Sequence, residues 1–236
     1  MLFRRILLAA LLCGLLSGGL LGVMQLYTTL PLILAAERLE NSAATAQPEN
    51  QQQPLQSSLK RNLLSMAATT IIACAYAMIL LSLMRLSGRT AICYSAWWGL
   101  SGYLVFFLMP ALGLPPSLPG VQYASLEFNR LWWLASSVST AAALCMLFFA
   151  RHWFKLGGIL LLLLPFALRL NNPLLIHYDS ASSEVIAELE WLQPQFIFAS
   201  AASLALFWML LSLFSSLACS YYLDKFPVKG AADSSG

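Results

Sequence analysis

The chain has 236 residues, of which 59% are hydrophobic and only 10% are charged, and its formal net charge is +3. Soluble domains carry about 25% charged residues. The deficit therefore argues against a soluble protein and for membrane lipid as the surroundings, because ionised groups are costly in hydrocarbon. A net charge this small, without a basic cluster, also argues against nucleic acid as a partner.

Apolar runs of spanning length recur along the sequence and predict an all-α integral membrane protein. A helix needs roughly 20 apolar residues to cross the hydrocarbon layer. Six runs are candidates, and together they predict a single transmembrane bundle over 1–236: residues 6–30, 63–84, 91–112, 131–150, 155–170 and 196–220. The first is too long for the roughly 7–15-residue core of a signal peptide, so we expect it to be retained. The fifth is short and contains Pro165, so a bundle of five helices is the alternative.

The first span contains Gly14, Gly18 and Gly22 at four-residue spacing. Such a face lets another backbone approach closely, so it predicts helix packing. Near the end of this span, Gln25 is costly in lipid unless a partner satisfies it. It is interpreted either as an interhelical hydrogen-bonding group or as a ligand or gate residue close to Glu37.

Two connecting segments follow the first and third spans. Residues 38–61 are polar and rich in glutamine, which predicts a flexible outer loop. Residues 113–130 form a Pro-rich outer turn, in which "GLPPSLPG" stops the helix because proline cannot donate a backbone hydrogen bond. Irregular backbone is tolerated in a membrane protein only where protein or water covers it. We therefore expect a rigid cap on the outer face, which either shapes a vestibule or simply ends a helix.

Hydroxyl side chains gather in the fourth span, with Ser136 and Thr140 one turn apart. Hydroxyls can bond the carbonyls of their own helix, and a polar seam between helices is the alternative. Taken with the first span, the candidate cation path comprises Gln25, Glu37, Ser136 and Thr140.

The last outer loop, residues 171–195, contains a predicted short acidic helix lying on the membrane interface. The loop supplies the candidate residues for outer cation capture: His177, Asp179, Glu184 and Glu188. One histidine and one carboxylate make an incomplete metal site. The acidic residues are interpreted either as solvated loops or as an outer mouth whose negative field concentrates cations.

The basic residues favour six spans. With the N-terminus in the cytoplasm, six spans place eight Lys and Arg residues inside and five outside, whereas five spans give seven and six. Cytoplasmic segments are normally the richer in Lys and Arg. We therefore expect a multi-pass protein with a cytoplasmic N-terminus.

Several kinds of chemistry find no support in the sequence. No Asp, Glu, Lys or Arg lies in the interior of a predicted span, so a carboxylate proton relay is unsupported. The signatures of a P-loop, a zinc peptidase and a serine hydrolase are absent. The five cysteines form no C-x-x-C pair and are interpreted as small hydrophobes in helices. We expect neither an enzyme nor a bound cofactor.

Four stretches carry a resemblance to a known family and cover about half of the chain. They are "FRRILLAALLCGLLSGGLLGVMQ" leading to "PLILAAE", "WWGLSGYLVFFLMPALGLPPSLPG", "RLWWLASSVSTAAALCMLFFARHW" and "QFIFASAASLALFWMLL". In these the chain resembles the CbtA family, the predicted cobalt transporter subunit of bacteria. The segment "FFLMPALGLPPSLPG" is the most specific of them. Gln25, Glu37 and residues 110–120 match the family motif.

The resemblance implies a bacterial inner-membrane protein of about five spans that acts with CbtB, a small one-span partner with a histidine-rich motif. Cobalt or a similar divalent cation would be its substrate. Two departures stand out: the first outer loop has no histidine, and Phe166 stands where relatives tend to have one. Imidazole is a favoured ligand of such ions, so metal identity, and metal transport itself, stay open. The expectation is a metal-cation uptake subunit, and the alternative is a non-transporting scaffold or assembly subunit.

Overall fold

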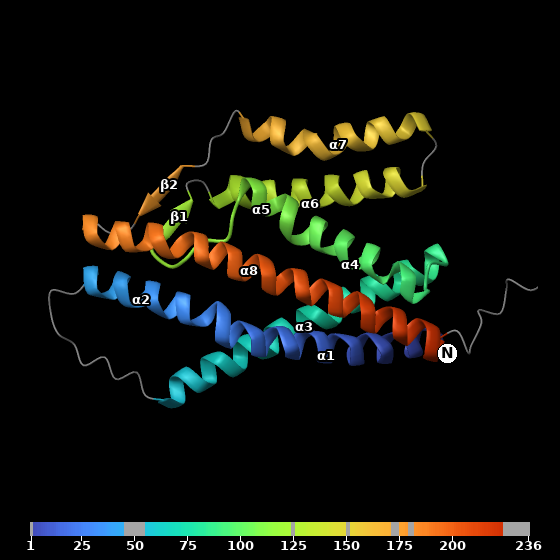
Figure 1. Ribbon diagram of the computed structural model, residues 1–236, viewed down its shortest axis with the longest axis horizontal. Coiled ribbons are helices and arrows are strands. Elements are labelled where there is room, and N and C mark those ends of the chain that lie inside the picture. The colour runs from blue at the N-terminus through green and yellow to red at the C-terminus, as the bar shows by residue number, and fades with distance from the viewer. Residues whose placement is uncertain are drawn as a thin grey trace, which may run out of the picture. The chain divides into compact units, whose positions relative to one another are not determined.

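The computed structural model describes residues 2–44, 55–123, 126–149, 152–170, 175–178 and 182–223, and nearly all of them are helical (Figure 1). The helices are α1 (Leu2–Thr28), α2 (Leu30–Ala44), α3 (Leu55–Ser87), α4 (Ser95–Tyr103), α5 (Met109–Gly113), α6 (Leu126–Phe149), α7 (His152–Leu170) and α8 (Ser183–Ala218). Two short strands, β1 (Val121–Tyr123) and β2 (Ile176–Tyr178), complete the fold, with a 3-10 turn at Ile92–Tyr94 and π-helical turns at Leu104–Leu108 and Cys219–Leu223.

Five helical stretches among the described residues are long and apolar enough to cross a membrane. They are Phe3–Thr28, Lys60–Ser87, Ile92–Gly113, Leu126–Phe148 and Ser183–Leu223, and Lys155–Ala167 is a shorter apolar helix. The predicted class of helical membrane protein is confirmed. The short stretch is the one for which the sequence left crossing open.

Contacts divide the chain into two compact units, where the sequence predicted a single bundle over 1–236. The first unit takes in the described residues of Met1–Met24, Gln53–Leu100 and Ala205–Gly236. The second takes in those of Gln25–Gln52 and Ser101–Leu204.

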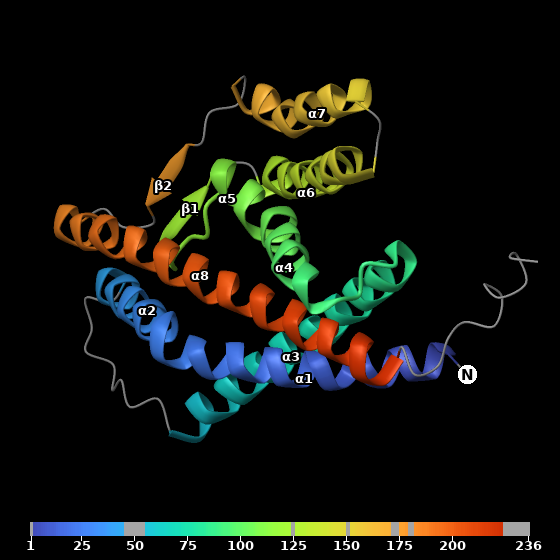
Figure 2. The ribbon, with the colours of Figure 1, turned by 45° about the vertical axis from the view of Figure 1, so that its right-hand side comes forward.

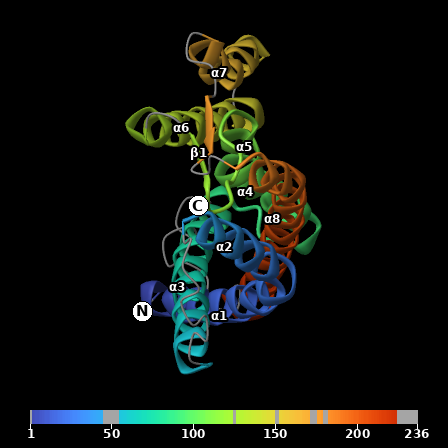
Figure 3. The ribbon, with the colours of Figure 1, turned by 90° about the vertical axis from the view of Figure 1, so that its left-hand side faces the viewer.

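In the first unit, α1 crosses α3 at very short range (Figure 3). A Cβ atom built on Gly14 would lie 2.4 Å from the Cα of Cys74, and one built on Gly18 would lie 2.9 Å from the Cα of Thr70. One built on Gly22 would meet the side chain of Met66 at 3.2 Å. The three glycines therefore lie on the face of α1 that contacts α3, and the absence of side chains is what permits the approach.

In the second unit, α6 and α7 lie side by side, and the strand before α6 pairs with the strand after α7 (Figure 2). The pairing is antiparallel, with Val121 opposite Tyr178 and Gln122 opposite His177. Paired strands must lie on the same side of a membrane. A chain that leaves that side through α6 must therefore return through α7. All 19 residues of α7 extend over about 28 Å, but its apolar stretch, Lys155–Ala167, is shorter than the roughly 20 residues of a spanning helix. The strand pairing agrees with the expectation of six spans, and the short apolar stretch agrees with the alternative of five.

The connecting segments differ from their predicted extents. The loop expected over 38–61 is partly helical, since α2 continues to Ala44 and α3 begins at Leu55, and residues 45–54 lie outside the described residues. Alanine, glutamate, leucine and arginine at its start are good helix formers. The turn expected over 113–130 is shorter, because β1 lies within it and α6 begins at Leu126.

The prediction of a separate short acidic helix within 171–195 is wrong. Its residues form the first turns of α8, which continues through Pro194 to Ala218. The 36 residues of α8 give a length of about 54 Å, well beyond the hydrocarbon thickness. The acidic turns are thus an extension of a spanning helix, and the exposed Trp191 lies on that extension.

Candidate functional site

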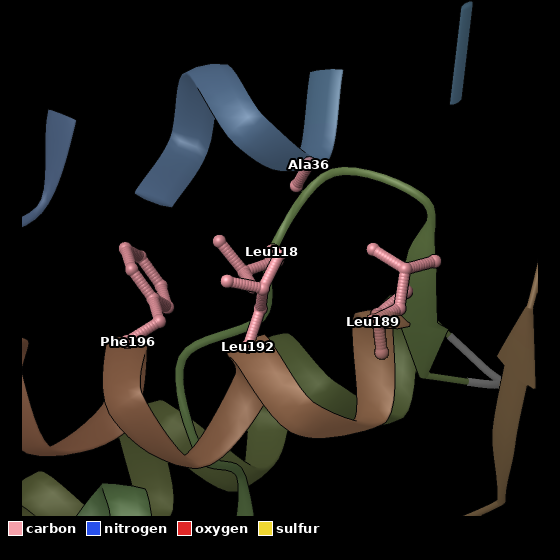
Figure 4. Packing of buried hydrophobic residues seen from close by; sticks show 6 residues of the cluster. Ala36, Leu118, Leu189, Leu192 and Phe196 are labelled. Atoms are coloured by element: carbon pink, nitrogen blue, oxygen red, sulfur yellow. The ribbon is translucent and has the colours of Figure 1, made fainter. Parts of the chain in front are cut away.

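Three connecting segments of the second unit pack into one structure, which we call the cap. It comprises α2, residues 114–123, β2 and residues 183–196 of α8. Its apolar centre is formed by six buried residues: Ala36, Leu118, Val121, Leu189, Leu192 and Phe196. Figure 4 shows Leu118 of the Pro-rich segment lying between Ala36 and the apolar side of α8. Burial of these side chains holds α2, the Pro-rich segment and the first turns of α8 together.

Gln193 fastens the Pro-rich segment to α8. Its Oε1 accepts a hydrogen bond from the backbone N–H of Leu118 at 3.1 Å. Its Nε2 donates to the backbone oxygen of Pro116 at 2.8 Å and lies 3.2 Å from the hydroxyl oxygen of Tyr123. A segment with several prolines lacks backbone N–H donors and cannot form regular helix or sheet hydrogen bonds. The Gln193 amide supplies hydrogen-bond partners to its backbone instead.

Trp132 fixes the helix end that leads into the cap. Its indole N–H donates to the backbone oxygen of Pro110 at 3.0 Å, and the side chain is buried. A Cβ on Gly113 would lie 2.1 Å from the Trp132 ring, so only glycine leaves room there. Proline at 110 cannot donate to the carbonyl one turn earlier, and the helix widens into the π-helical turn Leu104–Leu108 immediately before it. Such turns often occur at functional sites.

Two tyrosines of the strand pair are shifted in their ionisation. Burial raises the pKa of Tyr123 above its ordinary value of 10.0, against a lowering by the hydrogen bond with Gln193. For Tyr178, burial raises the pKa above 10.0, and the Glu190 carboxylate raises it further. The Tyr178 hydroxyl lies 3.3 Å from Oε1 of Glu190 and donates to it. Both tyrosines therefore keep their protons more firmly in the folded cap.

A dependence of cap stability on alkaline pH follows from these shifts. Because the folded pKa lies above the unfolded one, the stabilisation is complete below about pH 10 and is lost as pH rises through the folded pKa. Thermal unfolding in detergent should show this loss when it is followed at several pH values from about 8 to about 12. Tyr178→Phe should reduce the loss, and an equal loss in both proteins would contradict the assignment to Tyr178.

The predicted path residues are not brought together. Ser136 and Thr140 are buried in α6, where Ser136 donates to Trp133 O at 3.0 Å and Thr140 donates to Ser136 O at 2.6 Å. Gln25 is half-buried in α1, and within the described part of the chain no hydrogen bond joins it to these hydroxyls. Because the hydroxyls of Ser136 and Thr140 bond carbonyls of their own helix, they argue against the predicted polar seam between helices. A different polar pair is present: Thr28 Oγ1 lies 3.3 Å from Ser203 Oγ.

The capture residues lie on the cap without converging. His177 is exposed in β2, Glu184 and Glu188 are exposed on α8, and Glu37 is half-buried on α2 next to the buried Ala36. Asp179 lies outside the described residues. Among the residues that the structure describes, no three His, Cys, Asp or Glu side chains form a group able to hold a metal ion. Within the described part of the chain, His177, Glu184 and Glu188 therefore do not form a coordination site.

Comparison with known proteins gives one decisive match. Residues 3–220 match the family described as "Probable cobalt transporter subunit (CbtA)". The chain belongs to the CbtA family. No curated protein and no solved structure matches it.

The position where CbtA relatives were expected to carry a late histidine has a packing role in this chain. The ring of Phe166 meets that of Trp132 edge to face, with centroids 5.6 Å apart and planes at 77°. Phe166 thus supports the tryptophan that binds Pro110, and it offers no ligand to a metal.

Sequence reasoning missed Gln193 in this CbtA chain, although a signal was present. Leu189, Leu192 and Phe196 follow helical spacing, and Gln193 lies on the same stripe. A polar residue on the apolar stripe of a helix usually has a partner. Here the partner is the Pro-rich segment.

Proposed function

We propose that this CbtA chain is the membrane subunit of a cobalt-type divalent cation uptake system in a bacterial inner membrane, with the cap outside and the N-terminus in the cytoplasm. The family supports a cobalt transporter subunit. The observation that carries the proposal further is the charge of the cap. Its segments contain five carboxylates, Glu37, Glu40, Glu184, Glu188 and Glu190, against one basic residue, Arg38.

The cap would act by raising the local concentration of cations. Carboxylates on a rigid surface create a negative potential that speeds the arrival of cations. The hydrogen bonds from Gln193 keep the Pro-rich segment in place beside them.

A transporter subunit acts with other subunits and is not itself expected to be an enzyme. The resemblance names a small one-span protein with clustered histidines, CbtB. Such a partner would supply the imidazole ligands that the described part of this cap does not group together.

Uptake of radioactive Co²⁺ into cells tests the proposal. We expect Glu37→Gln combined with Glu184→Gln and Glu188→Gln to slow uptake about tenfold at low ionic strength. The defect should shrink at high salt, because salt screens the field. The parent protein provides the matched control, since its own rate should fall with salt. Equal uptake by parent and variant at low salt would remove the cap carboxylates from the account.

A non-transporting scaffold is the second candidate. It is favoured by the absence of a metal-holding group among the described residues and by the self-satisfied hydroxyls of α6. Reconstitution in liposomes separates the two. Co²⁺ flux with the partner present supports transport, whereas partner retention after detergent extraction without flux supports the scaffold.

A further inference from the structure

The first unit carries basic residues without acidic ones. Residues 1–24, 53–100 and 205–223 contain no Asp or Glu, and their basic residues are Arg4, Arg5, Lys60, Arg61, Arg85 and Arg89. Residues 224–236, which lie outside the described residues, add Asp224 and Asp233 against Lys225 and Lys229, and so no net charge. What the unit can attract therefore depends on where the basic residues lie.

The crossing of α1 and α3 fixes the relative direction of the two helices. A Cβ on Gly14 would meet Cys74, whereas one on Gly22, further along α1, would meet Met66, which comes earlier in α3. The two helices are therefore antiparallel. The start of α1 lies at the same end of the unit as the end of α3.

Four arginines share that end, which we call the basic end: Arg4, Arg5, Arg85 and Arg89. Arg5 lies nine residues before Gly14, about 14 Å along α1, and Arg85 lies eleven residues after Cys74, about 17 Å along α3. Lys60 and Arg61 lie on the other side of the crossing, at the opposite end of the unit.

Hydrogen bonds hold other segments at the basic end. Arg85 Nη2 donates to the backbone oxygen of Leu223 at 3.4 Å, which places the last turn after α8 beside the end of α3. The indole N–H of Trp98 donates to the backbone oxygen of Arg89 at 3.1 Å, which places the start of α4 there as well. The arginines are thus part of a packed end where four helices meet.

The basic end lies at the depth of lipid headgroups. Arg4 and Arg85 each lie within two residues of the end of an apolar spanning stretch, Phe3–Thr28 and Lys60–Ser87. Basic side chains at such positions reach the headgroup layer.

Apolar and aromatic side chains surround the arginines. Phe3 and Leu86, the sequence neighbours of Arg4 and Arg85, are exposed. Trp97 and Tyr221, which belong to the segments joined at this end, are exposed too. Aromatic rings of this kind lie at the membrane interface. The basic end therefore offers cationic groups next to surface that suits acyl chains.

The charge balance favours one class of lipid. A guanidinium group binds phosphate oxygens through paired hydrogen bonds. The headgroup of phosphatidylglycerol carries its phosphate without a cation, whereas that of phosphatidylcholine carries a quaternary ammonium group, which arginines repel. Basic residues near a membrane surface attract anionic lipid by about fivefold each.

We propose that the basic end of the first unit is a binding surface for the headgroups of anionic phospholipids. This surface is separate from the cap and from the transport proposal, and it does not depend on which ion is carried. Bound anionic lipid would neutralise the arginines and hold the ends of α1 and α3 at the interface.

Native mass spectrometry of the purified full chain tests this surface. The probe is an equimolar mixture of phosphatidylglycerol and phosphatidylcholine with the same acyl chains, added in detergent. We expect the parent protein to retain phosphatidylglycerol at least tenfold more than phosphatidylcholine. Arg4→Gln combined with Arg5→Gln should reduce this preference about tenfold or more. Arg4→Lys combined with Arg5→Lys should keep most of it, because the charge remains.

The matched control is Lys60→Gln combined with Arg61→Gln, which removes two charges from the opposite end of the same unit. It should keep the parent preference. Equal retention of the two lipids by the parent, or an equal loss in the control and in the Arg4 and Arg5 variant, would overturn the proposal. Displacement of phosphatidylglycerol by an equal concentration of inorganic phosphate would also overturn it, because the surface would then bind free phosphate. Arg85→Gln should weaken the preference further, and the α1 variants decide the matter if loss of the bond to Leu223 prevents its folding.

Discussion

Replacing Gly14 with alanine should destabilise the first unit by about 1–3 kcal/mol. The added methyl group would lie 2.4 Å from the Cα and 2.6 Å from the N of Cys74, and both are backbone atoms that cannot rotate away. Relief requires α1 to move away from α3, which loses packing along the crossing. The measurement is thermal or denaturant unfolding of the purified protein in detergent.

Gly19→Ala is the matched control, since a Cβ at Gly19 meets nothing within 4 Å. Both substitutions improve intrinsic helix propensity equally, by up to about 1 kcal/mol. The control should therefore be neutral or stabilising, and any difference between the two reports the helix crossing. Equal stability of the two variants would show that α1 does not approach α3 as closely as the structure has it.

The sequence predicted the membrane class and most spanning segments because those depend on composition and length. Apolar runs of about 20 residues have few alternatives in lipid. The small-residue face of the first span was visible in the same way, since spacing of four residues places Gly14, Gly18 and Gly22 on one side of any helix. What spacing could not give was the neighbour, which is α3.

The sequence predicted where the Pro-rich segment of the cap lies along the chain, but not which other segments pack against it. Four prolines within residues 110–120 indicated a rigid segment, but its partners depend on contacts between distant positions. Gln193 binds Pro116 and Leu118 from 77 and 75 residues away. Local pattern carries no information on such pairings. The same limit explains the error over the acidic helix: the sequence separated that helix from the span predicted over 196–220, yet α8 is continuous through Pro194. A missing backbone donor is tolerated where the surrounding packing is strong.

Replacing Gln193 with leucine should open the Pro-rich segment of the cap. The variant keeps the apolar stripe of α8. It removes the amide group that pairs with the backbone N–H of Leu118 and with the backbone oxygen of Pro116. Each buried group left unpaired costs about 1–3 kcal/mol, and Leu118 is 2% exposed. Amide hydrogen exchange across residues 117–123 should become roughly 10–100-fold faster, because local opening governs exchange there.

Gln195→Leu is the control for this change, because the side chain of Gln195 donates only within its own helix, to Trp191 O at 3.2 Å. It alters the same helix with the same substitution and leaves the loop backbone satisfied, so exchange in the cap should stay at the parent rate. If Gln193→Leu exchanged no faster than this control, the apolar cluster around Leu118 would be sufficient to hold the cap. Faster exchange confined to the first variant, together with slower Co²⁺ uptake, would connect the rigidity of the Pro-rich segment to the delivery of cations.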